Sequence, residues 1–154
     1  MRFTYLPAHP ASGSARSSTV PKAFFDTNVL IYQLDKRDAA KQKLCRDLVQ
    51  DHAARGEAVV STQILQEFYV VATSELRIDP SRVKRIIRTL ENMEVVAVGV
   101  DLIHEAIDTS VQSDLSFWDA LVIVAAESAN CERLYSEDMS SGQTVRTVKI
   151  TTPF

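Results

Sequence analysis

Short apolar runs alternate with amphipathic segments along most of this chain. The runs have the length of buried strands, and the segments between them place apolar residues at helical spacing. Strands that alternate with helices in this way favour a parallel sheet with helices on both faces. We therefore predict an α/β fold, a three-layer α/β/α sandwich with a central parallel sheet. The predicted strands are 22–25, 58–60, 94–98, 133–136 and 146–150, and the predicted helices are 27–34, 38–54, 64–76, 79–90, 102–111 and 116–130.

The composition fits one globular domain. Of the 154 residues, 45% are hydrophobic and 24% are charged, which is ordinary for a soluble protein. Residues 1–20 are rich in Pro, Ala and Ser and have no structural period, so we expect a disordered leader or a mis-assigned start, with the domain at 21–154. Cys45 and Cys131 lack metal-ligand spacing, which predicts reduced, buried thiols and a cytoplasmic protein. No apolar run has the length of a membrane span.

Charge and glycine content exclude some classes of function. The net charge of −3 argues against a general basic coat for nucleic acid, but an enzyme can hold a phosphodiester through a metal ion instead. The chain has only four glycines and no glycine-rich phosphate loop, which excludes a Walker or dinucleotide-binding site. The predicted helix 79–90 has a basic face that is either simply solvated or a patch for RNA or an acidic partner. Its bases are Arg82, Lys84, Arg85 and Arg88.

Four acids fall where such a fold would bring them together. Asp26 ends the first predicted strand, and Asp138 follows the fourth. Glu67 and Asp119 lie in the first turns of helices, and helices that follow parallel strands begin at the carboxyl edge of the sheet. We therefore expect all four carboxylates to converge at that edge.

Each acid also has a structural alternative. Asp26 could only cap the helix after it, and Asp119 stands at capping-box spacing from Ser116. Glu67 could be an exposed helical acid, and Asp138 could be a turn residue. Four such alternatives at one end of one sheet are a less economical explanation than a shared site.

Converging carboxylates favour a metal-dependent site. Carboxylates packed together repel one another and take up protons unless a cation neutralises them. Hard oxygen ligands with water suit Mg²⁺ or Mn²⁺, which can activate a water for in-line attack on phosphorus. The three histidines form no ligand set with the acids, and no Ser or Cys nucleophile is required.

Four segments together resemble the PIN-domain ribonucleases, and closely the VapC-type toxins of bacterial toxin–antitoxin pairs. They are FFDTNVLIY, STQILQEFY, LSFWDALVIVAA and CERLYSEDM, the last followed by Gly142 and Gln143, and the resemblance spans residues 22–154. It implies an α/β/α sandwich with Mg²⁺- or Mn²⁺-dependent endoribonuclease activity on RNA. It also implies a homodimer and a partner antitoxin whose C-terminal segment lies over the active site.

The resemblance assigns roles to individual residues. Asp26 and Asp119 match family acids that we expect to ligate the metal directly. Glu67 and Asp138 match acids that we expect to bind through water or a second ion. The chain departs from the family at its TTPF end, where relatives commonly have Asn before Pro-Phe, in its longer leader, and at Asp114. The residues expected to support the site are Asn28, Ser136 and, as an extra acid, Glu137.

Two other functions compete with this interpretation. The segment DTNVL resembles the DxDxT/V motif of haloacid-dehalogenase-like phosphatases, with Glu137 and Asp138 as the later acid pair. That chemistry needs an acid two residues after Asp26, where this chain has Asn28, and no cap domain is evident. The other alternative is a catalytically silent PIN-fold binding module, against which the four intact acids count.

Overall fold

The computed structural model describes residues 21–154, and the predicted leader lies outside them. These residues form one six-stranded sheet in the order β3-β2-β1-β4-β6-β5. All neighbouring strands are parallel except β5, which runs antiparallel to β6. The strands are β1 (Ala23–Phe25), β2 (Ala58–Ser61), β3 (Glu94–Val96), β4 (Arg133–Tyr135), β5 (Thr144–Val145) and β6 (Val148–Thr151).

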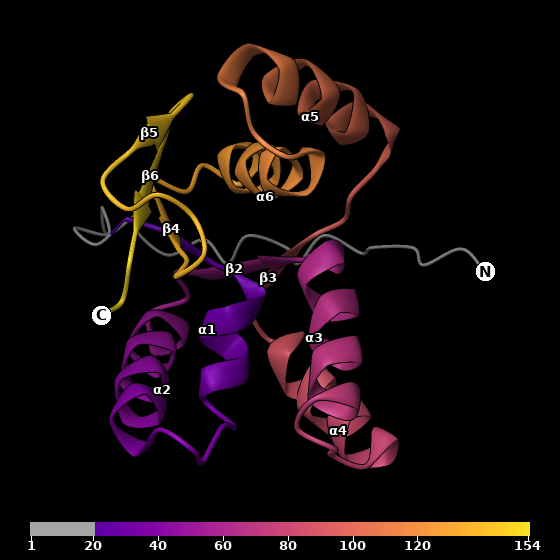
Figure 1. Cartoon of the computed structure of the whole chain (residues 1–154), viewed down its shortest axis with the longest axis vertical. Coiled ribbons are helices and arrows are strands. Elements are labelled where there is room, and N and C mark those ends of the chain that lie inside the picture. The colour runs from indigo at the N-terminus through magenta and orange to yellow at the C-terminus, as the bar shows by residue number, and fades with distance from the viewer. Residues whose placement is uncertain (1–20) are drawn as a thin grey trace, which may run out of the picture.

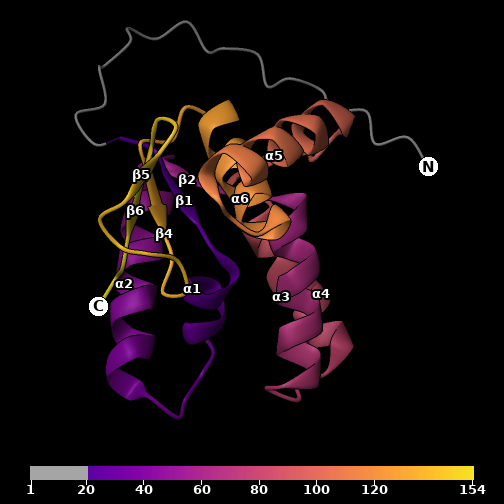
Figure 2. The ribbon, with the colours of Figure 1, turned by 45° about the horizontal axis from the view of Figure 1, so that its top comes forward.

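Helices cover both faces of this sheet, so the predicted α/β/α architecture is confirmed. Figure 1 shows α5 and α6 on one side of the strands and α1 to α4 on the other, and Figure 2 shows the same division after rotation. Within residues 21–154, no helix is long and apolar enough to cross a membrane. The helices are α1 (Thr27–Tyr32), α2 (Ala39–Ala54), α3 (Thr62–Ser74), α4 (Pro80–Leu90), α5 (Val100–Ser113) and α6 (Phe117–Ser128).

The central strand β1 is buried completely. Its three residues are inaccessible to solvent, because parallel strands under helices on both faces need apolar side chains on both sides. Phe25 stacks on Tyr135 of β4, with ring centroids 5.5 Å apart, and β1 and β4 pair at these two residues. This pairing brings Asp26 and Ser136, the residues that follow, to the same point on the carboxyl edge.

The C-terminal end of the sheet differs from the prediction. The predicted strand 146–150 is wrong in its first residues, because Arg146 lies in the tight turn between β5 and β6. Arg146 has a φ of 55°, a left-handed conformation that is uncommon for a residue other than Gly, Asn or Asp. Thr144 pairs with Lys149 and Val145 with Val148, which adds an antiparallel strand that the sequence analysis did not predict.

Several helix ends also differ from the predicted ones. The first helix ends at Tyr32, and Leu34 lies in the turn that follows it. The third begins at Thr62, directly after β2, because Ser61 caps it with its hydroxyl. The prediction of buried thiols is confirmed, since Cys45 and Cys131 are both buried and unpaired.

Candidate active site

Asp26 occupies the junction between β1 and α1. Its backbone N–H donates to Tyr135 O over 3.0 Å, which continues the pairing of β1 with β4 by one residue. One carboxylate oxygen accepts from the Thr27 N–H at 2.8 Å, so Asp26 does cap α1. The other oxygen accepts from the Ser136 hydroxyl at 2.7 Å. Capping therefore occupies only one oxygen, and the predicted structural role and a site role are compatible.

Burial raises the pKa of Asp26 from 3.8 to about 6. The hydrogen bonds from Ser136 and Thr27 lower the pKa, while the negative charges of Glu67 and Asp138 raise it further. Without a counter-ion, this carboxyl group therefore takes up a proton at a pH only slightly below neutral.

Glu67 is held on α3 by two donors. The Thr27 hydroxyl donates to one of its oxygens at 2.7 Å, and the Gln63 side-chain amide donates to the other at 3.0 Å. Gln63 lies four residues earlier on the same helix, where side chains share a face. The half-buried Glu67 carboxylate is thus fixed toward the Asp26 junction and is not the freely exposed acid of the structural alternative.

Asp138 is connected to α1 through Asn28. The Asn28 amide nitrogen donates to Asp138 at 2.9 Å, and its oxygen accepts from the Glu137 N–H at 3.3 Å. Asn28 therefore holds the segment after β4 at two points, the backbone N–H of Glu137 and the carboxylate of Asp138.

Asp119 lies in the first turn of α6. Ser116 caps that helix through its hydroxyl, which accepts from the Asp119 N–H at 3.1 Å. The cap thus uses the backbone of Asp119 and the side chain of Ser116. The carboxylate of Asp119 lines the same pocket as the other three acids.

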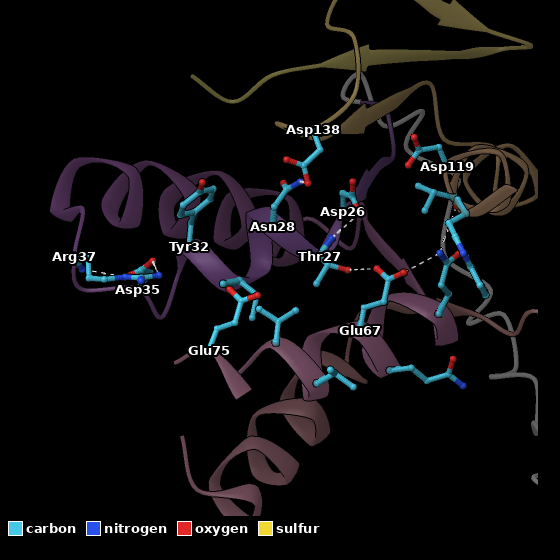
Figure 3. A pocket seen from close by; sticks show the side chains of 17 residues that line it. Asp26, Thr27, Asn28, Tyr32, Asp35, Arg37, Glu67, Glu75, Asp119 and Asp138 are labelled. Atoms are coloured by element: carbon cyan, nitrogen blue, oxygen red, sulfur yellow. Dashed lines mark hydrogen bonds and ion pairs between the residues drawn. The ribbon is translucent and has the colours of Figure 1, made fainter. Parts of the chain in front are cut away.

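One pocket of about 750 Å³ contains all four predicted acids. Figure 3 shows Asp26, Glu67, Asp119 and Asp138 around one part of it, with Asp35 and Arg37 at the far end. Glu67 comes from α3 and Asp119 from α6, whereas Asp26 and Asp138 lie in the segments that follow β1 and β4. Among the described residues that line the pocket, Arg37 is the one basic side chain. The part of the pocket that these four acids line is therefore strongly anionic.

The acids of the pocket do not form a group that would enclose an ion. Among residues 21–154, no three His, Cys, Asp or Glu side chains are grouped closely enough to hold one ion together. Mg²⁺ usually keeps several waters and uses only one or two carboxylates. In addition, the side-chain oxygen of Gln63 is buried without a hydrogen-bond partner, and it could accept from such a water. The acid set and this free acceptor are consistent with Mg²⁺ or Mn²⁺.

Glu137 lies apart from the other acids. Its carboxylate accepts from Lys41 Nζ at 2.5 Å and from the Tyr32 hydroxyl, and these hydrogen bonds lower its pKa. It is not among the residues that line the pocket. Phe154 packs edge-on against the Tyr32 ring at 5.5 Å, so the TTPF end is joined to this same cluster.

The sequence analysis missed some residues that shape the site. Thr27 and Gln63 hold Glu67 by hydrogen bonds. The four-residue spacing of Gln63 from Glu67 was a signal for Gln63, whereas the sequence held no signal for Thr27. Asp114, noted as a departure, is the left-handed C-cap of α5, with a φ of 52°, and lies outside the pocket. A left-handed cap suits Asp because its short side chain tolerates that conformation.

The fold and the pocket together define an α/β protein with an acidic site at the carboxyl edge of a parallel sheet. A family model for the PIN domain matches residues 23–140, and the chain belongs to this family. The match includes the segment that suggested a haloacid dehalogenase, so the phosphatase alternative loses its basis. The comparison with curated proteins gave no match.

Several solved structures with similar folds are toxins or toxin–antitoxin complexes. A toxin–antitoxin complex from Klebsiella pneumoniae is 18% identical with a TM-score of 0.65, covering 86% of this chain and 98% of that one. DNA-bound VapBC from Salmonella typhimurium is 13% identical with a TM-score of 0.64, covering 88% and 100%. A sarcin–ricin loop cleaving VapC toxin from Mycobacterium tuberculosis is 18% identical with a TM-score of 0.61, covering 76% and 92%. At these identities the likeness concerns the fold.

Proposed function

We propose that this chain is a metal-dependent endoribonuclease and the toxin of a type II toxin–antitoxin pair. The observation that supports this most is that Asp26, Glu67, Asp119 and Asp138 line one pocket. The sarcin–ricin loop cleaving toxin among its structural neighbours has the same fold. The proposed substrate is RNA, and the reaction is hydrolysis of a phosphodiester bond.

The chain's own residues prepare the site for an ion. We propose that Asp26 and Asp119 ligate Mg²⁺ or Mn²⁺, with Glu67 and Asp138 acting through water or a second ion. When bound, such an ion lowers the pKa of a water and stabilises negative charge on the phosphate. Ser136 and the Thr27 N–H fix the two oxygens of Asp26, so little reorganisation is needed.

The pocket's charge makes substrate binding depend on the same ion. RNA phosphates are repelled by four carboxylates, and Arg37 at the far end cannot neutralise all of them. We therefore expect both RNA binding and hydrolysis to require the divalent cation.

The proposed protein partner is a cognate antitoxin whose C-terminal segment covers the site. Two of the similar solved structures described above, the complex from Klebsiella pneumoniae and DNA-bound VapBC from Salmonella typhimurium, are toxin–antitoxin assemblies, which supports this assignment.

We also propose a homodimer. One face of α5 exposes an apolar stripe at helical spacing, which is costly for an isolated domain. If this face joins two copies, Ile107→Glu should convert a dimer into a monomer in light scattering. The stripe consists of Val100, Ile103, Ile107 and Val111.

Growth arrest on induction tests the proposed activity in cells. The wild-type chain should arrest growth and leave discrete new 5′ ends in total RNA, while Asp26→Asn combined with Asp119→Asn should do neither. If the wild type and the double variant both leave growth and RNA unchanged, the silent binding module is the better explanation.

A further inference from the structure

Trp118 is an exposed aromatic ring beside the acids. It is the only tryptophan of the chain, its side chain is 62% exposed, and it lines the same pocket as Asp119, the next residue of α6. Burying a large aromatic side chain is more favourable than leaving it in water, and such side chains are enriched where a protein contacts a ligand or a partner. The position of Trp118 therefore indicates that a ligand or a partner binds at the pocket.

The backbone of Trp118 is held close to the acids, and its ring has one aromatic neighbour. The Gln63 amide that donates to Glu67 also reaches the Trp118 carbonyl oxygen, at 3.4 Å. The Trp118 ring meets the Phe117 ring edge-on at a centroid distance of 5.2 Å, and Phe117 is partly buried against the core cluster around α5 and α6. The indole thus packs against Phe117 while most of the residue remains in solvent.

We propose that Trp118 is a substrate-contacting residue that stacks an unpaired base of the RNA next to the bond that is cut. This inference rests on the proposed ribonuclease function and assigns the contact with the base to one residue of the pocket. Aromatic rings bind bases through stacking, and only a base that has left its helix offers a free face. Arg37 is the one basic residue among the described lining residues, so contacts with phosphates supply little binding energy in this pocket. Stacking of a base on Trp118 would supply binding energy that does not depend on charge.

A second copy of the chain is the other occupant that the ring could have. Trp118 is on α6, which packs against α5, and α5 presents the exposed apolar stripe. Burial by a second copy would not depend on RNA and would depend on protein concentration. The same measurement can therefore distinguish the two occupants.

Intrinsic fluorescence reports on this residue directly because the chain has a single tryptophan. The probes are a hairpin RNA with a randomised loop and a blunt duplex of the same stem, mixed with the wild-type protein in Mg²⁺ and read before cleavage has proceeded. We expect saturable quenching by the hairpin and little by the duplex. Quenching by both alike, or a shift that follows protein concentration without RNA, would overturn the proposal.

A graded set of variants tests the stacking itself. Trp118→Phe keeps a ring, and Trp118→Leu keeps apolar bulk without one. We expect hairpin binding, measured by a label on the RNA, to weaken about 5- to 100-fold in Trp118→Leu, and less in Trp118→Phe. In cleavage assays of the same variants, the weaker binding should appear mainly as a higher KM.

Tyr69→Leu is the matched control. Tyr69 is also an exposed aromatic, at 42%, but it lies on α3 and is not a pocket-lining residue, so its loss should leave binding and cleavage unchanged. Equal KM values for Trp118→Leu and wild type would overturn the stacking role while leaving the nuclease function in place. If the wild type neither binds nor cleaves any RNA, the proposed function and this inference fail together.

Discussion

The hydroxyl of Ser136 donates a hydrogen bond to Asp26 across 2.7 Å, joining the ends of two adjacent parallel strands. Ser136 is fully buried, so its hydroxyl has no access to water as an alternative partner. The bond favours the charged form of Asp26, and it opposes the effect of burial on the pKa of that carboxyl. It is the most direct example here of a residue that acts on the site through another residue.

Ser136→Ala should weaken metal binding without removing a ligand. The hydrogen bond that favours the Asp26 carboxylate is lost, and loss of such supporting bonds typically costs about 10- to 100-fold in metal affinity. The measurement is the Mg²⁺ concentration that gives half-maximal RNA cleavage. Ser128→Ala is the control, since that hydroxyl bonds only Ala125 O within α6. Equal Mg²⁺ requirements for the two variants would contradict the role given to Ser136.

Asp26→Asn should increase stability in the absence of metal while abolishing activity. The pKa of Asp26 is raised from 3.8 to about 6, so between these pH values the folded wild type binds more protons than the unfolded chain. Its stability relative to the variant therefore falls as pH rises from 4 to 6, by roughly 2–3 kcal/mol in total.

Urea unfolding in EDTA at a series of pH values measures this difference. The gain from Asp26→Asn should be present above pH 6 and should shrink toward pH 4, and added Mg²⁺ should stabilise the wild type only. A stability difference that is independent of pH would show that Asp26 is not held in a charge-unfavourable environment.

Asp119→Ala and Ser116→Ala should separate activity from helix capping. The cap of α6 uses the Ser116 hydroxyl and only the backbone N–H of Asp119. Ser116→Ala should therefore lower the free energy of unfolding by about 1 kcal/mol and retain activity. Asp119→Ala should abolish RNA cleavage with a change of roughly 0.5 kcal/mol or less. The reverse pattern would make Asp119 a structural residue.

Glu67→Gln and Glu75→Gln remove the same charge from the same pocket. Glu67 is bound by Thr27 and Gln63 near Asp26, whereas Glu75 follows α3 at the Arg37 end. Glu67→Gln should lower kcat/KM about 10- to 100-fold, as expected for loss of a carboxylate that supports a metal site. Glu75→Gln should have little effect. Equal losses would mean that only the net charge of the pocket matters.

The layers of the fold and the place of the acids in it were predictable because both follow from strong local patterns. Buried parallel strands are short continuous apolar runs, and an acid directly after one can only lie at the carboxyl edge. The β5–β6 hairpin was missed because its turn contains Arg146 at positive φ and no Asn-Gly or Gly signal.

The supporting contacts could not be predicted in the same way. Glu137 follows Ser136 directly, yet its carboxylate is bound by Lys41 and Tyr32 from distant parts of the chain. Which neighbour of a strand end faces the pocket depends on that tertiary packing. The connection of Asn28 to Asp138 likewise joins residues 110 positions apart.

RNA cleavage by the purified protein tests the central claim most directly. Wild type and the Asp26→Asn, Asp119→Asn double variant are incubated with total RNA in Mg²⁺, in Mn²⁺ and in EDTA, and new 5′ ends are sequenced. We predict discrete cleavage sites for the wild type with either metal, none in EDTA, and none for the double variant. Cleavage that persists in EDTA, or that the double variant performs equally well, would contradict a metal site built from these acids.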